Sequence, residues 1–245
     1  MADVVTIGDL IRNGTMSASM AATMWAAMDR RMSVVTAAIP RLAGKTTTTS
    51  AILSLLPADV PIHRLSGEEP EMIKLKETAT GGYLVVGEFS QGPVPTYIWG
   101  APVRRVFDTM TAGYSLATTL HASGVEEAFD IICRGNGVSD ESASRVGIML
   151  YIRRFGNDMD DFWRRVAEIH EVDAVNNGRP HGRLLYRWLE DVDRFESVET
   201  PRFLNGSPSE LAARTAKLEE LAASDLRSDA DVAKMVEEYR RAASD

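Results

Sequence analysis

The chain has 245 residues, of which 44% are hydrophobic and 25% are charged, and its formal net charge is −8. This composition is that of an ordinary globular protein with one α/β core and a small appendage, and no repeat or low-complexity segment interrupts it. The negative charge, without a long basic run, argues against direct nucleic-acid binding, and no apolar run approaches the length of a membrane span.

The cysteine count and the start of the chain bear on the cellular compartment. A single cysteine, Cys133, excludes an intramolecular disulfide, fits a reducing compartment and is expected to be a small buried residue. No apolar segment behind a basic start indicates a signal peptide. We therefore expect a cytoplasmic protein, which reaches the inner face of a membrane only through partners.

The first half of the chain alternates short apolar runs with amphipathic stretches. A helix is expected after the N-cap candidate Ser17, because apolar residues from Met20 to Met28 recur at helical spacing. Further segments follow in chain order: strands over 34–38, 60–65, 83–86 and 115–120, and helices over 46–56, 103–112 and 126–133. The Gly- and Pro-rich stretch 92–102 is expected to be an irregular loop. This alternation predicts a mostly parallel sheet with a ligand at the C-terminal ends of its strands.

The second half has a different pattern. Apolar segments over 148–152, 165–172 and 183–188, separated by Gly-, Asn- and Asp-rich turns, predict antiparallel strands at the edge of the core. From Pro208 onwards, leucines among alternating charges predict one or two surface helices. We divide the chain into a lead-in helix packed on the core (1–32), an α/β domain (33–190) and a C-terminal helical extension (191–245).

The segment Leu42–Thr48 contains the triplet Gly-Lys-Thr between an expected strand and an expected helix. This order is typical of a phosphate-binding P-loop, in which backbone N–H groups and the positive helix end face the phosphates. We expect Ala43, Gly44, Lys45, Thr46 and Thr47 to form this loop. Lys45 would then reach the β- and γ-phosphates of a nucleotide, and the Thr46 hydroxyl would bind Mg²⁺. Ile39 stands where the full motif has its first glycine.

Two more polar residues, Glu88 and His121, directly follow expected strands. Glu88 could orient or deprotonate an attacking water, or it could be a solvated carboxylate at a strand end. His121 could sense a terminal phosphate, or it could be a buried or helix-capping histidine. The remaining histidines, His63, His170 and His181, lack metal-ligand spacing and are expected to be structural.

Four stretches resemble motifs of the motor ATPases of type II and type IV secretion and of type IV pili, which are RecA-like P-loop enzymes. Residues 42–47 resemble their Walker A motif, and 84–88 (Leu-Val-Val-Gly-Glu) resemble their Walker B motif. Residues 111–122 resemble their His box, and 165–172 (Arg-Val-Ala-Glu-Ile-His-Glu-Val) resemble a strand near their C-terminal end. With the segment leading into the P-loop, the likeness covers about residues 10 to 190.

The resemblance implies a RecA-like ATPase core that uses ATP and Mg²⁺, with Glu88 and His121 as catalytic residues. It also implies a ring, with a hexamer expected, or association with an ATPase paralogue, together with a membrane platform protein of a secretion or pilus machine.

The sequence departs from the family pattern at several positions. Phe89-Ser90-Gln91 stand where the family has an arginine after Gly-Glu, and the His box opens with Gly113-Tyr114 rather than Gly-His. The Asp box is reduced to Glu68-Glu69. The separate N-terminal domain of the family has no counterpart in this sequence, so a ring is expected to manage without it or to borrow it from a partner.

Two arginines could replace the missing one. Arg104 and Arg105 are the nearest candidates for cations that act in trans on a neighbouring subunit, or they belong to a solvated helix start. Tyr97, Trp99 and Tyr114 could flank a base or serve local packing.

Three functions remain open. The chain is an ATPase motor subunit, or it is a catalytically weak or inactive P-loop module that acts as a regulatory or structural subunit beside an active paralogue. A small-molecule kinase is the third alternative, although no acceptor site or lid is evident.

Overall fold

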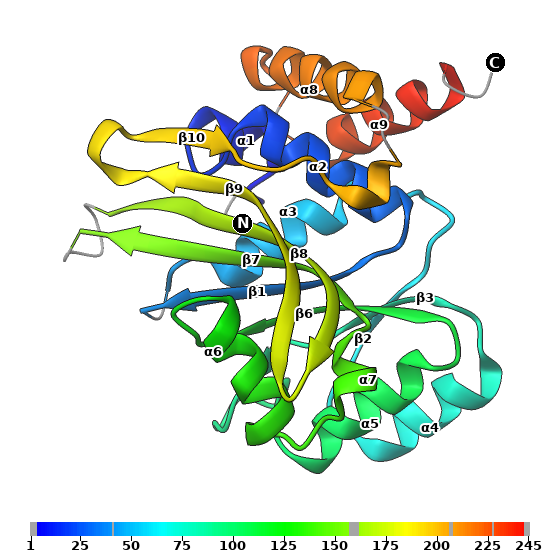
Figure 1. Ribbon diagram of the computed structural model, residues 1–245. Helices are drawn as coiled ribbons and strands as arrows, with labels where there is room; N and C mark the ends of the chain where they lie inside the picture. Colours follow the sequence, from blue (N-terminus) through cyan, green and yellow to red (C-terminus); the bar gives the residue numbers. More distant parts are fainter. Residues whose placement is uncertain (1–3, 41, 157–161, 206–207, 227, 243–245) are drawn as a thin grey trace.

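The structure, a computed structural model, describes residues 4–40, 42–156, 162–205, 208–226 and 228–242. Its centre is an eight-stranded sheet with the order β10-β9-β8-β7-β1-β6-β3-β2 (Figure 1). The strands are β1 (Ser33–Ile39), β2 (Ile62–Arg64), β3 (Gly82–Val85), β6 (Tyr114–Leu120), β7 (Val146–Phe155), β8 (Trp163–Asn176), β9 (Arg179–Leu189) and β10 (Arg194–Ser197). Two short strands, β4 (Glu88–Phe89) and β5 (Tyr97–Ile98), pair separately. The strands from β2 to β7 in this order are parallel, and β8, β9 and β10 continue the sheet antiparallel.

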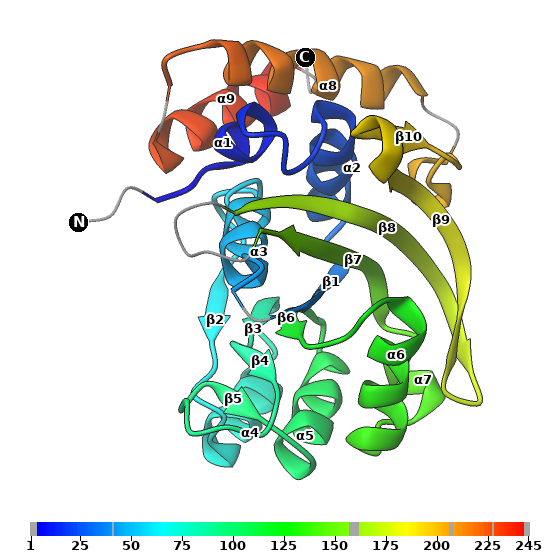
Figure 2. The same ribbon diagram turned by 90° about the vertical axis from the view of Figure 1, so that its left-hand side faces the viewer.

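Helices cover both faces of the sheet (Figures 1 and 2). One layer contains α1 (Ile7–Arg12), α2 (Ala18–Asp29), α3 (Lys45–Leu53), α8 (Pro208–Ala223) and α9 (Asp229–Ala242). The opposite layer contains α4 (Glu69–Thr78), α5 (Ala101–Met110), α6 (Val125–Asp130) and α7 (Asp140–Ala143). A π-helical turn over Ile131–Gly135 extends α6, and 3₁₀ turns lie at Glu190–Val192 and Arg202–Leu204.

The central strand β1 shows why the sheet is buried on both sides. Val34 and Ala38 belong to the core under the N- and C-terminal helices, whereas Val35 and Ala37 belong to the core under α4, α5 and α6. Successive side chains of a strand point to opposite faces, so a strand covered on both faces needs a continuous apolar run rather than an alternating one. The mostly parallel α/β sheet expected from the sequence is therefore confirmed, as are its antiparallel strands on one side.

The expectation for residues 148–152 needs correction. This segment lies in β7, which pairs with β8 in antiparallel fashion but also with β1 in parallel, with Thr36 opposite Leu150. The segment is thus an interior strand and not an edge strand. Its C-terminal end consequently lies at the same side of the sheet as the C-terminal end of β1.

Other differences are local. The expected loop 92–102 contains β5 and the first two residues of α5, and α3 ends at Leu53, before the expected end at residue 56. The helix α4 was missed because its sequence has no clear apolar stripe. In the structure, accordingly, Met72 is its only buried residue. The strand β10 was missed for a similar reason, since its four residues are all partly exposed.

The two ends of the chain pack together. The indole of Trp25 in α2 lies against the ring of Tyr239 in α9, with centroids 4.8 Å apart. Asp29 at the end of α2 forms ion pairs with Arg214 of α8 and Arg240 of α9. The C-terminal helices are thus held on the N-terminal helices. Of the described helices, none is both long and apolar enough to cross a bilayer.

Candidate functional site

The turn between β1 and α3 leads into the N-terminus of α3 through Gly44. Gly44 has φ +82° and is the N-cap of α3, so Lys45 is the first helical residue. This left-handed backbone conformation favours glycine. The residues that follow Gly44 form the first turn of α3, whose N–H groups have no partner within the helix. The hydroxyl of Thr49 donates a hydrogen bond of 2.9 Å to Thr36, which fixes α3 against β1. The positive end of the helix dipole therefore points out of the C-terminal edge of the sheet.

Lys45, Glu88 and His121 meet beside this turn. The Nζ atom of Lys45 lies 3.2 Å from Oε2 of Glu88 and 3.4 Å from Nε2 of His121. The same Nε2 lies 3.4 Å from the other carboxylate oxygen, Oε1, of Glu88. The three residues follow β1, β3 and β6, which are neighbours in the sheet. Parallel strands end at one side of a sheet, and this brings the three side chains together.

The carboxylate of Glu88 is almost completely buried but incompletely satisfied. The exposed fractions of the Lys45 and Glu88 side chains are 7% and 4%. Thr119 lies 3.5 Å from Oε2, whereas Oε1 is buried without any hydrogen-bond donor. Nδ1 of His121 lies 3.3 Å from the carbonyl oxygen of Ala38, an acceptor, and this favours the tautomer protonated on Nδ1. In this arrangement Oε1 of Glu88 therefore has an unused capacity to accept a hydrogen bond.

These residues line a cavity of about 570 Å³, which lies in the size range of small-molecule sites. The residues predicted for the site that line it are Ala43, Gly44, Lys45, Thr46, Thr47, Glu88 and His121. Thr46 is exposed towards solvent, so its hydroxyl is accessible to a metal ion. Tyr97, for which the sequence left base contact and local packing open, also lines the cavity, together with the loop residues Gly92, Pro93 and Val94.

The sequence analysis missed three residues of the cavity wall, namely Arg154, Phe162 and Arg164. The two arginines are directly opposite each other on β7 and β8, and each guanidinium lies 4.6 Å from the centre of the Phe162 ring. Burial, and then the charge of Arg154, lowers the pKa of Arg164. The doublets Arg153-Arg154 and Arg164-Arg165 near the facing ends of two strands were the available signal.

Arg104 and Arg105 do not face this cavity. Arg104 donates a hydrogen bond of 2.8 Å to the carbonyl of Asn136. Arg105 forms ion pairs with Glu69 and Asp108, and these carboxylates raise its pKa. Within one chain, both arginines are thus engaged on the α4–α5 side of the molecule.

His63, His170 and Tyr114 have local partners. His63 lies 3.1 Å from the carbonyl of Gly81, and His170 lies 2.8 Å from Glu168. Tyr114 donates to the carbonyl of Leu75. Within the described ranges, no group of three His, Cys, Asp or Glu side chains could hold a metal ion.

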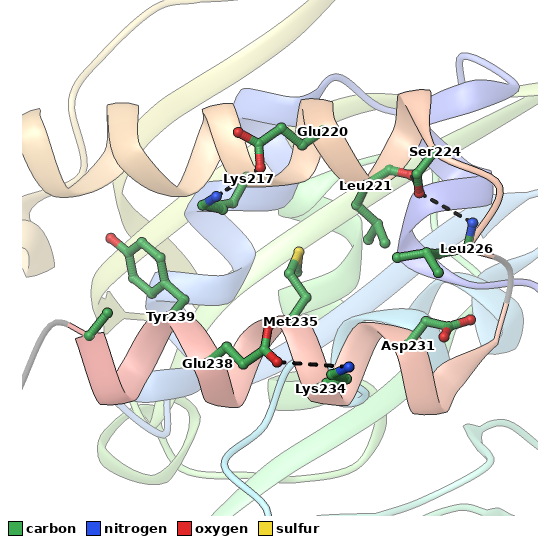
Figure 3. Close-up of a pocket in the computed structure, with 11 residues that line it drawn as sticks. Lys217, Glu220, Leu221, Ser224, Leu226, Asp231, Lys234, Met235, Glu238 and Tyr239 are labelled. Carbon is green, nitrogen blue, oxygen red and sulfur yellow. Dashed lines mark hydrogen bonds and ion pairs between the residues drawn. The ribbon is translucent and has the colours of Figure 1, made fainter.

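A second cavity, of about 520 Å³, lies between α8 and α9 (Figure 3). Its wall contains Lys217 and Lys234, but each ammonium pairs with a carboxylate of its own helix, Glu220 and Glu238. Its chemistry therefore differs from that of the cavity at Lys45, which is the candidate functional site.

The comparisons with known proteins give distant likenesses. No family model and no curated protein matches the chain. Among solved structures it is similar to the VirB11 ATPase of the Brucella suis type IV secretion system in complex with sulphate, with 15% identity and a TM-score of 0.43 over 60% of this chain. It is also similar to the DotB ATPases of Yersinia pseudotuberculosis (13%, 0.42, 87% of this chain) and Legionella pneumophila (15%, 0.42, 92% of this chain). The matches span 50%, 59% and 63% of those chains, and at these values they assign neither a family nor a function.

Proposed function

We propose that the chain binds Mg²⁺-ATP in the cavity at Lys45 and hydrolyses it as an ATPase subunit of a secretion or pilus-type machine. The observation that carries the proposal is the contact of 3.2 Å between Lys45, at the N-terminus of α3, and Glu88, which follows β3. This contact supports the proposal because an ammonium at a helix N-terminus lies beside a buried carboxylate at the C-terminal edge of the parallel strands.

Phosphoryl transfer to water requires neutralisation of the phosphate charge and a positioned nucleophile. The N–H groups at the start of α3 and the ammonium of Lys45 supply the first requirement. Mg²⁺, held by the Thr46 hydroxyl, would add further positive charge on the phosphate oxygens. Oε1 of Glu88, which is buried without a donor, supplies the second requirement by accepting a hydrogen bond from the attacking water.

His121 adds a group that responds to the nucleotide. Its ring contacts both Lys45 and Glu88, so a phosphate that attracts Lys45 would change all three contacts. The strand β6 that carries His121 also pairs with β1 and β3. We therefore assign to His121 the role of sensing the terminal phosphate.

The place of this activity in a machine rests on the motif resemblance. On that basis the subunit would form a hexameric ring or pair with an ATPase paralogue, and it would work with a membrane platform protein. An inactive regulatory module is the alternative, and the same experiment separates the two.

The test is phosphate release from Mg²⁺-ATP by the full chain, compared with Lys45→Ala and Glu88→Gln. Matched controls are Lys74→Ala and Glu219→Gln, because both side chains are exposed and lie outside the cavity. Loss of a positioned base or phosphate cation is expected to lower turnover at least about 100-fold, with the controls unchanged. Thermal unfolding of each variant shows whether it is folded.

Binding of a fluorescent ATP analogue completes the test. Lys45→Ala is expected to lose binding, whereas Glu88→Gln retains it. Binding by the wild-type chain without turnover would establish the regulatory alternative. A wild-type chain that neither binds nor hydrolyses ATP would overturn the proposal.

A further inference from the structure

Four arginines lie in two cross-strand pairs where β7 and β8 approach the cavity. Arg153 is opposite Arg165, and Arg154 is opposite Arg164. Because successive side chains of a strand point to opposite faces, one pair faces the cavity and the other faces away from it. The lining of the cavity agrees, since it contains Arg154 and Arg164 and neither of the other two.

The pair that faces away from the cavity is neutralised by the protein. Arg153 forms an ion pair of 2.7 Å with Glu190, and Arg165 forms two hydrogen bonds of 2.7 Å with Asp193. Each arginine thus has its own carboxylate. Two like charges directly opposite each other in a sheet repel, and these counter-charges remove the repulsion.

Arg164 has no such partner among the residues that the structure describes. Its Nη2 donates a hydrogen bond of 3.5 Å to the carbonyl of Leu42, and its Nε is buried without an acceptor. No ion pair between described residues includes it, and the charged group beside it is the guanidinium of Arg154. A cation that is partly removed from water next to a like charge is destabilising unless an anion joins it.

The position of Arg164 identifies where that anion would lie. A Cβ atom added to Gly44 would come within 3.0 Å of Cδ and Nε of Arg164, so this side chain lies directly over the turn that begins α3. The only carboxylate in the described wall of the cavity is Glu88, and it is already paired with Lys45. Among the described residues no carboxylate of the wall is left to neutralise Arg164, and a ligand anion above Gly44 would do so.

We propose that Arg164 is a phosphate-binding residue of this cavity, which reaches the phosphate chain of the nucleotide from the same chain that supplies Lys45. This inference rests on the proposed function for the identity of the ligand. A planar guanidinium that binds phosphate oxygens bidentately adds positive charge in cis. The family that the sequence resembles has an arginine after the residue that corresponds to Glu88, and this chain lacks it. Arg164 of β8 would then supply a positive charge in its place.

The experiment measures the affinity of the full chain for ATP, for inorganic pyrophosphate and for adenosine by calorimetry. The variants are Arg164→Gln and Arg164→Lys, and the matched control is Arg165→Gln, the next residue on the opposite face. Loss of a charge-assisted contact is expected to weaken ATP and pyrophosphate binding about 10- to 100-fold in Arg164→Gln. Arg164→Lys should bind with intermediate affinity, Arg165→Gln as the wild type, and adenosine equally to all.

A stability measurement separates phosphate binding from a structural role of Arg164. Without ligand, Arg164→Gln should unfold at the same temperature as the wild type or higher, because it relieves repulsion with Arg154. Pyrophosphate should raise the unfolding temperature of the wild type and not that of Arg164→Gln. A variant that is destabilised without ligand and still gains stability from pyrophosphate would overturn the inference.

The two proposals fail in different ways. If the wild type binds ATP and Arg164→Gln binds it equally well, the inference about Arg164 is wrong and the proposed function stands. If the wild type binds pyrophosphate through Arg164 but no ATP, the proposed function is wrong and the anion site stands. If the wild type binds neither, both are wrong.

Discussion

Lys45 and Glu88 are 43 positions apart in the chain, yet Nζ of the first lies 3.2 Å from Oε2 of the second, and both side chains are almost completely buried. A buried pair of this kind is stabilised only as a pair, since removal of either partner leaves an uncompensated charge. The same contact occupies the ammonium that would bind phosphate. If the proposed function is right, a bound phosphate would compete with Glu88 for the ammonium of Lys45.

The first prediction follows from this pair. Lys45→Met leaves the carboxylate of Glu88 buried without its cation and is expected to lower the free energy of unfolding by about 3–5 kcal/mol. The double variant Lys45→Met/Glu88→Gln removes both charges and should recover most of that loss. Urea unfolding of the wild type, both single variants and the double variant measures the coupling. Equal losses in Lys45→Met and in the double variant would contradict it.

The second prediction concerns Gly44, which we compare with Gly113 as a matched position. Both have positive φ, +82° and +92°, so a Cβ atom imposes similar backbone strain of roughly 1–2 kcal/mol at each. Only at Gly44 does the added atom also meet a side chain, that of Arg164. Gly44→Ala is therefore expected to be more destabilising than Gly113→Ala.

The cause of that difference can be tested with a second substitution. In an Arg164→Ala background the obstacle at Gly44 is absent, so the two glycine variants should lose similar free energies of unfolding. If Gly44→Ala stays the more destabilising variant in this background, the contact with Arg164 is not the reason.

The third prediction concerns the attachment of the C-terminal helices. Asp29 accepts hydrogen bonds of 2.6 Å from Arg214 and 3.0 Å from Nε of Arg240, and the side chain of Arg214 is buried. Asp29→Asn is expected to lower the free energy of unfolding by about 2–3 kcal/mol, because other acceptors of these arginines remain. It should also speed the proteolysis of 208–242.

An exposed pair on the same helix is the control for this effect. Lys217 and Glu220 form an ion pair of 2.8 Å, with both side chains largely exposed. Lys217→Ala should change the free energy of unfolding by less than about 0.5 kcal/mol. An Asp29→Asn chain as stable and as protease-resistant as Lys217→Ala would show that the Asp29 contacts do not hold α8 and α9.

The fourth prediction is a pH dependence at the first helix. Burial acts to raise the pKa of Asp9, but hydrogen bonds from Arg12 and from Thr6 outweigh it and lower the pKa to about 2. A carboxyl with a lowered folded-state pKa stabilises the fold above its unfolded value, near 4, and loses this effect as the pH falls towards 2. At neutral pH the contribution is at most about 2 kcal/mol.

Urea unfolding of the wild type and of Asp9→Asn at neutral pH and near pH 2 measures this effect. The difference between them should be present at neutral pH and should shrink in acid. Asp130→Asn is the control, because the ion pair between Asp130 and Arg134 is exposed and should contribute little at either pH. A difference for Asp9→Asn that is independent of pH would contradict the assignment.

Local sequence signals were sufficient for several elements around the site. The N-cap Ser17, whose hydroxyl accepts a hydrogen bond from the amide of Met20, marks the start of α2 where the sequence predicts it. The apolar run before Lys45 forms β1, and the segments before Glu88 and His121 form β3 and β6. These predictions succeed because capping and strand burial depend on neighbouring residues.

Local sequence signals could not predict that Arg154 and Arg164 line the cavity. Arg154 and Arg164 follow the pattern of an exposed hairpin, and nothing local in β7 indicates that it pairs with β1 as well as with β8. That pairing moves the end of β7 to the edge where Lys45 lies. In contrast, Arg104 and Arg105 were nearer to the motifs in sequence, but the fold places them on the α4–α5 side.

The sequence by itself determined most of the strands and helices around the site, and it placed Lys45, Glu88 and His121 just after apolar strands, because these features depend on short-range backbone and burial preferences. Only the tertiary structure decided which strand lies beside which, and hence that Glu88 contacts Lys45 and that Arg164 covers Gly44. The physical reason is that strand order is set by burial of both sheet faces between two helical layers, a property of the whole chain that no local segment carries.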